Sequence, residues 1–198
     1  MTPVLNPVLN PVLTSAALPP AISVLYVFAG KARHNDIHSC LVRLAPGTVN
    51  EPEVDLIRGP LQDVLHSELW DSIIKRVNAG EFDVIIWTPP CNPFSRAFWN
   101  DNKVARLRDF DHPMGYPWLA GPNKAKCWAT NQFVHKTFEL AGLSFSVGAF
   151  FWTEHPENLG KAKEGRPASL CQLDTPKQST ELAGACTAAL RLRIWCRL

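Results

Sequence analysis

Residues 84–95 read Val-Ile-Ile-Trp-Thr-Pro-Pro-Cys-Asn-Pro-Phe-Ser, a short apolar run followed by a turn with three prolines and one cysteine. An apolar run of β-branched and aromatic residues that stops at prolines predicts a buried strand ending in a rigid loop. In open α/β sheets, ligands bind at the loops that follow the carboxyl ends of strands. Cys91 is therefore a candidate nucleophile, although most free cysteines are small buried hydrophobes.

Further strands and helices alternate on both sides of this stretch. The apolar runs predict strands at residues 24–28, at a segment ending at 54–55, at 83–87 and at 145–152. Helical spacing of apolar residues predicts helices at 36–44, 67–78 and 124–140. Strands that alternate with helices need right-handed crossovers and form a parallel sheet. We therefore predict an α/β fold with a Rossmann-like, mostly parallel sheet and flanking helices.

The two ends of the chain differ from this pattern. Residues 1–22 hold a tandem Pro-Val-Leu-Asn repeat, in which a proline at every fourth position forbids helix and interrupts strand pairing. We expect a disordered arm there, an α/β domain over residues 23–170, and an irregular tail over 171–198. Residues 190–194 alternate apolar and basic side chains, which fits an edge strand or an irregular segment equally well.

Composition limits the class of protein. Six cysteines are scattered without a C-x-x-C pair, which argues against a zinc module or a disulfide framework and for a reducing, intracellular setting. No apolar run approaches the roughly 20 residues that cross a bilayer, and no basic secretory start precedes one. We expect a soluble protein without a metal, in the nucleus or the cytoplasm.

Charge alone does not mark a nucleic-acid binder. The formal net charge is +2, whereas such domains usually show a pronounced basic patch. If nucleic acid binds, local basic side chains must contact its phosphates. The alternative is that these side chains lie in a solvated loop. The candidates follow the Cys91 loop and are Lys103, Arg106, Arg108, Lys124 and Lys126.

The Cys91 loop resembles a known catalytic motif. Pro90-Cys91 followed by Phe94-Ser95 is similar to the Pro-Cys-Gln-x-Phe-Ser loop of DNA cytosine-5 methyltransferases, with Asn92 in place of the glutamine. Three further segments occur in the order of that family, at residues 24–30, 54–55 and 153–158. The resemblance covers roughly residues 24–170. It implies an incomplete, class I methyltransferase-like domain that uses S-adenosylmethionine and acts on DNA or another nucleic acid.

The resemblance also assigns roles to single residues. Cys91 would add to C6 of cytosine, and Glu154 would donate a proton to N3 of the base, which must be flipped out of a duplex to reach them. An acidic residue after the second strand accepts hydrogen bonds from ribose hydroxyls, which is the role expected of Asp55. The cofactor contacts expected from the family are Phe28, Ala29, Gly30, Asp55, Asp63 and Pro90. The substrate contacts expected from it are Phe94, Ser95, Arg96 and Trp99.

The chain departs from the family pattern in four places. Gly30 is followed by Lys31, not by a further glycine two positions on, and His155 stands after Glu154 where the family has asparagine. Asp63 comes only eight positions after Asp55, which leaves no room for a crossover helix between them. Ala189 replaces the glutamine of the family's late arginine motif.

These departures keep other functions open. One alternative is a noncatalytic remnant of the fold that binds nucleic acid or protein. Another is an amino-methyltransferase, since residues 88–91 overlap its Asp/Asn-Pro-Pro-aromatic loop. A cysteine hydrolase would need His135 or His155 as its base. His34 and His38 have the spacing of metal ligands but lack an evident third ligand. The aromatic residues near 98–99 and 116–118 either stack on unpaired bases or cover the edge of the sheet.

Overall fold

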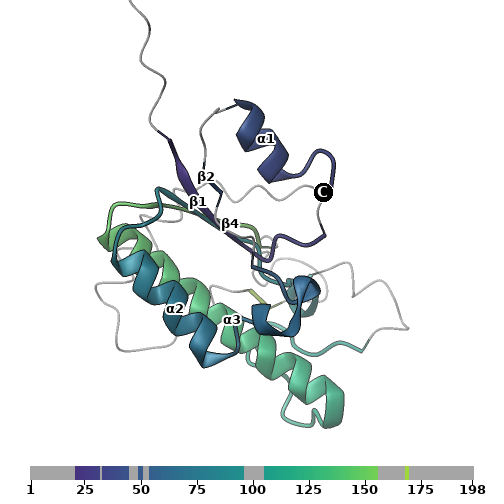
Figure 1. The fold of residues 1–198 in the computed structure, drawn as a ribbon. Coiled ribbons are helices and arrows are strands. Elements are labelled where there is room, and N and C mark those ends of the chain that lie inside the picture. Colours follow the sequence, from purple (N-terminus) through teal and green to yellow (C-terminus); the bar gives the residue numbers. More distant parts are fainter. Residues whose placement is uncertain are drawn as a thin grey trace, which may run out of the picture.

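The computed structural model describes residues 21–31, 33–44, 49–50, 54–95, 105–155 and 168–169. These residues form an α/β fold around one parallel sheet of four strands in the order β2-β1-β3-β4 (Figure 1). The strands are β1 (Ser23–Val27), β2 (Val49–Asn50), β3 (Val84–Trp87) and β4 (Phe150–Thr153). The helices are α1 (Ile37–Leu44), α2 (Ser67–Asn78) and α3 (Gly121–Ser146), with short 3₁₀ turns η1 (Leu56–Arg58), η2 (Pro60–Gln62) and η3 (Asn92–Phe94). The predicted α/β class with a parallel sheet and flanking helices is confirmed.

The carboxyl ends of the three longer strands lie level with one another. Val27 pairs with Trp87, and Trp87 pairs with Thr153. Val54 adds an isolated bridge beside Val27, so the segment that enters η1 reaches the same edge of the sheet. The residues that follow β1, β3 and β4 therefore emerge side by side.

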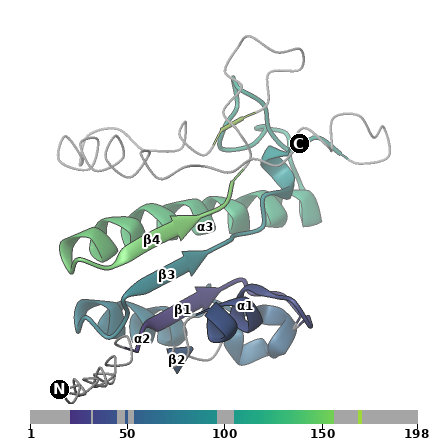
Figure 2. The same cartoon turned by 90° about the horizontal axis from the view of Figure 1, so that it is seen from above.

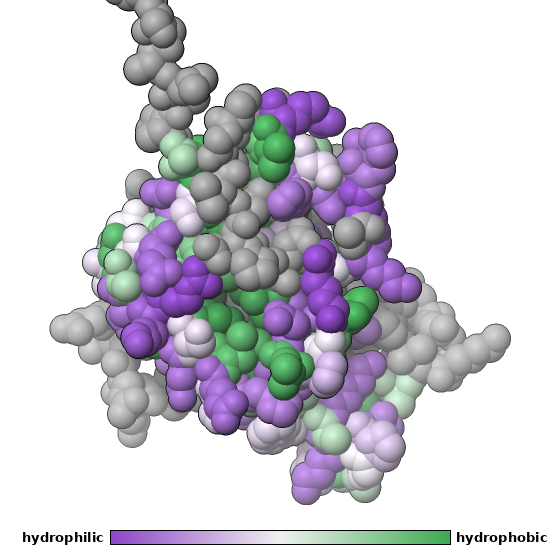
Figure 3. Space-filling view, viewed as in Figure 1, coloured by the Kyte–Doolittle hydropathy of each residue, from purple (hydrophilic) through white to green (hydrophobic). Residues whose placement is uncertain are grey.

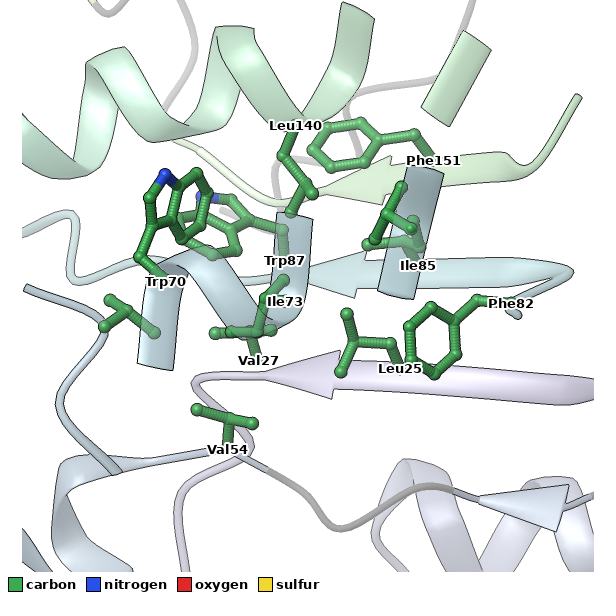
Figure 4. Packing of buried hydrophobic residues seen from close by; sticks show 12 residues of the cluster. Leu25, Val27, Val54, Trp70, Ile73, Phe82, Ile85, Trp87, Leu140 and Phe151 are labelled. Carbon is green, nitrogen blue, oxygen red and sulfur yellow. The ribbon is translucent and has the colours of Figure 1, made fainter. Parts of the chain in front are cut away.

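The helices cover the two faces of the sheet unequally. Helices α2 and α3 lie on one face and α1 lies on the other, as the two views show (Figures 1 and 2). The main core lies under α2 and α3, where the indole of Trp87 packs edge-on against that of Trp70 at 5.8 Å (Figure 4). Its other buried members are Leu25, Val27, Val54, Val64, Ile73, Val77, Phe82, Ile85, Leu140 and Phe151.

The side of the sheet on which successive strands are added changes at β1. From β1 the chain crosses to β2 on one side, whereas β3 and β4 lie on the other side. Such a reversal leaves a crevice outside the carboxyl ends of the two strands at which it occurs, here β1 and β3. The fold thus directs attention to the loops after Val27 and Trp87.

Several boundaries differ from the sequence prediction. Helix α3 spans Gly121–Ser146, beyond the predicted 124–140 at both ends. The predicted strand at residues 145–152 is wrong in its first part, because α3 continues to Ser146 and β4 begins at Phe150. Gly148 separates them with a φ of 78°, a left-handed conformation that glycine adopts without a steric penalty. The second strand is formed by Val49–Asn50, whereas Val54 makes only its isolated bridge.

Other predictions fall partly outside the described residues. The arm at residues 1–20 and the tail at 171–198, with its candidate edge strand, are not described. Within the described ranges, no helix is both long enough and apolar enough to cross a membrane.

On the face seen in Figure 3, apolar residues gather toward the middle with polar residues around them.

Candidate active site

The carboxylate of Asp55 joins the loop after β1 to the turn before η1. Its Oδ2 accepts a hydrogen bond of 2.7 Å from the Gly30 N–H, and its Oδ1 accepts one of 2.8 Å from the Ile57 N–H. A carboxylate offers about four lone-pair positions, so these two bonds leave acceptor capacity on Asp55. The side chain is buried, with 8% of its surface exposed. Asp55 therefore supports the loop and retains positions for a further donor.

The loop after β1 has an unusual backbone. Phe28 has a φ of 63° and Gly30 a φ of 73°. The left-handed region is common for glycine but strained for a bulky residue such as phenylalanine. Packing holds Phe28 there, since its ring meets those of Trp87 at 4.9 Å and Phe133 at 5.1 Å. Beside Gly30, no heavy atom of the described structure lies within 4 Å of where a Cβ would stand, which leaves room for close approach to its backbone.

The Cys91 loop is held by its own backbone. The Cys91 carbonyl accepts hydrogen bonds from the N–H groups of Phe94 at 2.9 Å and Ser95 at 3.1 Å, which closes the turn η3. Pro90 is exposed, whereas Cys91 and Ser95 are half-buried. The thiol thus lies at a fixed turn at the carboxyl edge of the sheet.

Phe94 anchors this loop. Its side chain is 2% exposed and packs in a second apolar cluster with Val134, Phe138 and Ala168. The Phe94 ring also meets that of His155 edge-on at 4.8 Å. A direct contact between this ring and a substrate, as the sequence predicted, would require the loop to move.

A row of polar side chains crosses the sheet face opposite α2 and α3. Tyr26 pairs with Ile86, and Ile86 pairs with Trp152. Because side chains alternate along strands, Thr88 and Glu154 follow on the face that carries Tyr26. The Tyr26 and Thr88 hydroxyls share a hydrogen bond, and Thr88 Oγ1 donates to the Phe28 carbonyl at 3.0 Å. Sequence reasoning gave Tyr26 no role, although strand alternation places it beside Thr88.

Acidic groups surround the Tyr26 hydroxyl. Burial raises the pKa of Tyr26 above its ordinary value, and the negative charges of Glu154, Asp36 and Asp55 raise it further. Asp36 itself accepts hydrogen bonds at the start of α1, from the Ser39 N–H at 2.8 Å and the Ser39 hydroxyl at 2.7 Å. These bonds, together with one from the Arg33 N–H, lower the pKa of Asp36 to about 2. This edge of the sheet therefore carries negative potential.

The structure places Cys91 within electrostatic range of Glu154. Burial raises the pKa of the Cys91 thiol, and the carboxylate of Glu154 raises it further. The sequence predicted that these two residues act together, and they follow neighbouring strands β3 and β4. At neutral pH the thiol is protonated, so nucleophilic attack would require removal of its proton.

The remaining predicted residues have varied positions. Ala29 is half-buried in the loop after β1. Asp63 accepts a hydrogen bond of 2.9 Å from the Leu65 N–H, a turn that leads toward α2. Arg96 and Trp99 lie outside the described residues.

The four histidines considered above lie in different surroundings. His34 precedes α1, which begins at Ile37, so His34 and His38 do not share a helix face. Within the described part of the chain, no three His, Cys, Asp or Glu side chains gather in a group that could hold a metal. His135 is exposed on α3, and His155 is buried against Phe94.

The loops after β1, β3 and β4 bring Gly30, Cys91 and Glu154 to one edge of the sheet, and the turn before η1 brings Asp55 to the same edge. The edge combines a thiol, an acid, an open backbone loop and negative potential. Comparison of this chain with family models, with curated proteins and with solved structures gave no match.

Proposed function

We propose that the chain is an S-adenosylmethionine-dependent methyltransferase of the DNA cytosine-5 type, with a Rossmann-like, class I methyltransferase fold. One observation carries the proposal: the carboxyl ends of β1, β3 and β4 lie side by side, next to the point where the strand order changes sides. It aligns the candidate cofactor loop at Gly30 with the candidate nucleophile Cys91 and the candidate acid Glu154. Ligand sites of open α/β sheets occur at such reversals.

The residues around Gly30 suit this cofactor. The open space beside the Gly30 backbone would admit its amino-acid part, and the remaining lone pairs of Asp55 would accept its ribose hydroxyls. Asp36, Asp55 and Glu154 provide the negative potential that favours a sulfonium cation. When bound, S-adenosylmethionine supplies an electrophilic methyl group.

Cys91 and Glu154 would act on the base together. Loss of the thiol proton gives a thiolate that bonds to C6, which makes C5 nucleophilic, while protonated Glu154 donates to N3. C5 would then bond to the methyl group that the cofactor supplies, the demethylated cofactor would leave as a neutral thioether, and N3 would return its proton to Glu154. Loss of the C5 proton to solvent would then let the bond from Cys91 to C6 break, which releases the thiolate.

A noncatalytic domain of the same fold is the second candidate. The raised pKa of Cys91 favours it, because a thiol that stays protonated is a poor nucleophile. Such a domain would bind cofactor without methyl transfer, or would bind no cofactor.

Calorimetry on the full chain tests the proposal. We expect saturable binding of S-adenosylmethionine that is weakened in Asp55→Asn and Asp55→Ala. The matched control is Asp83→Ala, because Asp83 also accepts a backbone N–H, from Ser23 at 2.7 Å, at the opposite, amino end of the strands. If the folded wild-type chain does not bind the cofactor, the proposal is wrong.

Trapping then separates an enzyme from a noncatalytic domain. DNA that contains 5-fluorocytosine retains fluorine at C5, so the adduct with the thiol cannot eliminate. We expect a covalent complex with the wild-type chain and S-adenosylmethionine, and none with Cys91→Ser. Cys40→Ser, which replaces a half-buried cysteine of α1, should still form the complex. Cofactor binding without any adduct would favour the noncatalytic domain.

A further inference from the structure

The segment between β3 and α3 carries an exposed aromatic stack. The rings of Tyr116 and Trp118 lie nearly parallel, at 10°, with their centroids 4.6 Å apart. The His112 ring meets Tyr116 at 5.4 Å and Trp118 at 5.7 Å. Trp118 is 69% exposed, so much of its ring faces solvent. We refer to His112, Tyr116 and Trp118 as the aromatic platform.

Hydrogen bonds hold the platform in shape. Asp109 Oδ1 accepts a hydrogen bond of 2.8 Å from the His112 N–H and lies 3.0 Å from Nδ1 of the same residue. Asp109 also shares a hydrogen bond with the side chain of Tyr116. The Tyr116 N–H donates to the Leu107 carbonyl at 3.0 Å. Because these bonds already hold the rings in place, binding of a stacked ligand costs little free energy for ordering them.

One buried arginine connects the platform segment to the Cys91 loop. Arg108 is 1% exposed, and its guanidinium lies 4.1 Å from the centroid of Phe94, the anchor of that loop. The same guanidinium donates to the Pro113 carbonyl at 2.9 Å and to the Cys127 carbonyl at 3.2 Å. Arg108 therefore joins the platform segment, helix α3 and the Cys91 loop.

Arg106 lies near Tyr116, and two further basic residues follow the platform at the start of α3. Burial and Asp109 raise the pKa of Tyr116, while the positive charge of nearby Arg106 opposes them. The start of α3 carries exposed Lys124 and Lys126, and no acidic residue occupies its first turn. Among residues 105–120, which the structure describes, the acids are Asp109, which is engaged with His112 and Tyr116, and Asp111. Basic side chains beside exposed aromatic rings suit a ligand with both phosphates and flat bases.

We infer that the aromatic platform binds an unpaired base of single-stranded nucleic acid, with the phosphates toward the basic side chains of Arg106 and α3. An open ring face accepts any base by stacking, whereas bases inside a duplex already stack on their neighbours. The inference rests on the proposed function in one respect, because it names the form of nucleic acid that reaches the Cys91 loop. Its test needs no cofactor.

Fluorescence anisotropy on the full chain provides that test. A labelled single-stranded oligonucleotide is titrated in parallel with its duplex, without S-adenosylmethionine. We expect the single strand to bind more tightly than the duplex. Trp118→Ala should weaken single-strand binding by roughly 5- to 150-fold, the range for loss of one stacked base. Lys124→Gln should reduce the salt dependence of binding.

Trp128→Ala is the matched control, since Trp128 is a 58% exposed tryptophan of α3 that takes no part in the platform rings. Thermal unfolding verifies that each variant is folded, and Trp118→Leu provides a second variant that removes the ring but stays apolar. The inference fails if Trp118→Ala and Trp128→Ala bind alike, if the duplex is preferred, or if the folded chain binds no oligonucleotide.

Calorimetry with S-adenosylmethionine separates this inference from the proposed function. Trp118→Ala should bind the cofactor as the wild type does, because Trp118 is not among the candidate cofactor residues. If the chain binds single strands through Trp118 but does not bind the cofactor, the inference about the platform holds and the proposed methyltransferase function is wrong. If the chain binds the cofactor but not single strands, the proposed cofactor site holds and the inference about the platform is wrong.

Discussion

The Gly30 N–H donates to Oδ2 of Asp55 at 2.7 Å across 25 residues of chain. This bond joins the loop after β1 to the segment that enters η1, and the second carboxylate oxygen accepts from Ile57 at 2.8 Å. One buried carboxylate thus fixes two backbone segments at the edge where the candidate cofactor site lies.

Removal of this carboxylate should destabilise the fold. In Asp55→Ala, two backbone donors lose their acceptor, and a buried unsatisfied donor costs about 1–3 kcal/mol. Asp55→Asn keeps one acceptor oxygen, so its free energy of unfolding should fall by less. Urea unfolding measures both, with Asp83→Ala as an exposed counterpart whose loss should be smaller. Equal free energies of unfolding for Asp55→Ala and Asp83→Ala would contradict the assigned role.

A buried hydrogen bond between sheet and helix gives a second prediction. Trp87 Nε1 donates to Thr137 Oγ1 at 2.7 Å. Thr137→Val keeps the shape but leaves the indole N–H unsatisfied, so the free energy of unfolding should fall by about 1–3 kcal/mol. Thr130→Val is the control on the same helix, because the Thr130 hydroxyl donates only to the Lys126 carbonyl among its described bonds, at 2.8 Å. A loss as large in Thr130→Val would show that the indole bond is not the cause.

The reactivity of Cys91 should depend on Glu154. Burial and the Glu154 carboxylate raise the pKa of the thiol, so less thiolate is present at a given pH than for an ordinary cysteine. Glu154→Gln removes the negative charge, so the pKa of Cys91 should fall. Alkylation of Cys91 should then begin at a lower pH than in the wild type. Mass spectrometry after iodoacetamide treatment over a pH series measures this change. Glu139→Gln, on the exposed surface of α3, should leave the Cys91 profile in place.

Asp36 should stabilise the start of α1 in a pH-dependent manner. Its pKa is lowered to about 2 by hydrogen bonds from Ser39 and Arg33, so the folded state favours the carboxylate. The stabilisation is complete above the ordinary aspartate pKa of 3.8 and is lost as pH falls toward about 2. The difference in urea midpoint between wild type and Asp36→Ala should therefore shrink over that interval. Asp71→Ala, in α2, controls for the loss of one negative charge.

Much of the fold could be predicted from local patterns. Apolar residues at helical spacing followed by Ala79-Gly80 predicted residues 67–78, and α2 has those bounds. The end of α3 was not predictable in this way. The apolar run from Phe145 to Trp152 suits both a strand and a buried helix, and only pairing with β3 decides that the strand begins at Phe150.

The site was predictable to a different extent. The order of the motifs and the parallel sheet sufficed to bring the loops after β1, β3 and β4 to one edge. The burial of Phe94 was not predictable, because its partners Val134 and Arg108 come from distant segments. Long-range packing of this kind leaves no local pattern in the sequence.

The central place of β1 has a consequence for how the chain assembles. β1 is the earliest described strand, yet its main partner β3 begins at Val84, 60 residues after Val24. During synthesis, the apolar residues of β1 must remain without that partner until β3 has left the ribosome. The parallel sheet therefore closes late, and slow, nonlocal pairing should limit the folding rate. A chain shortened before Val84 would contain the candidate cofactor loop and lack the strand that holds it in place.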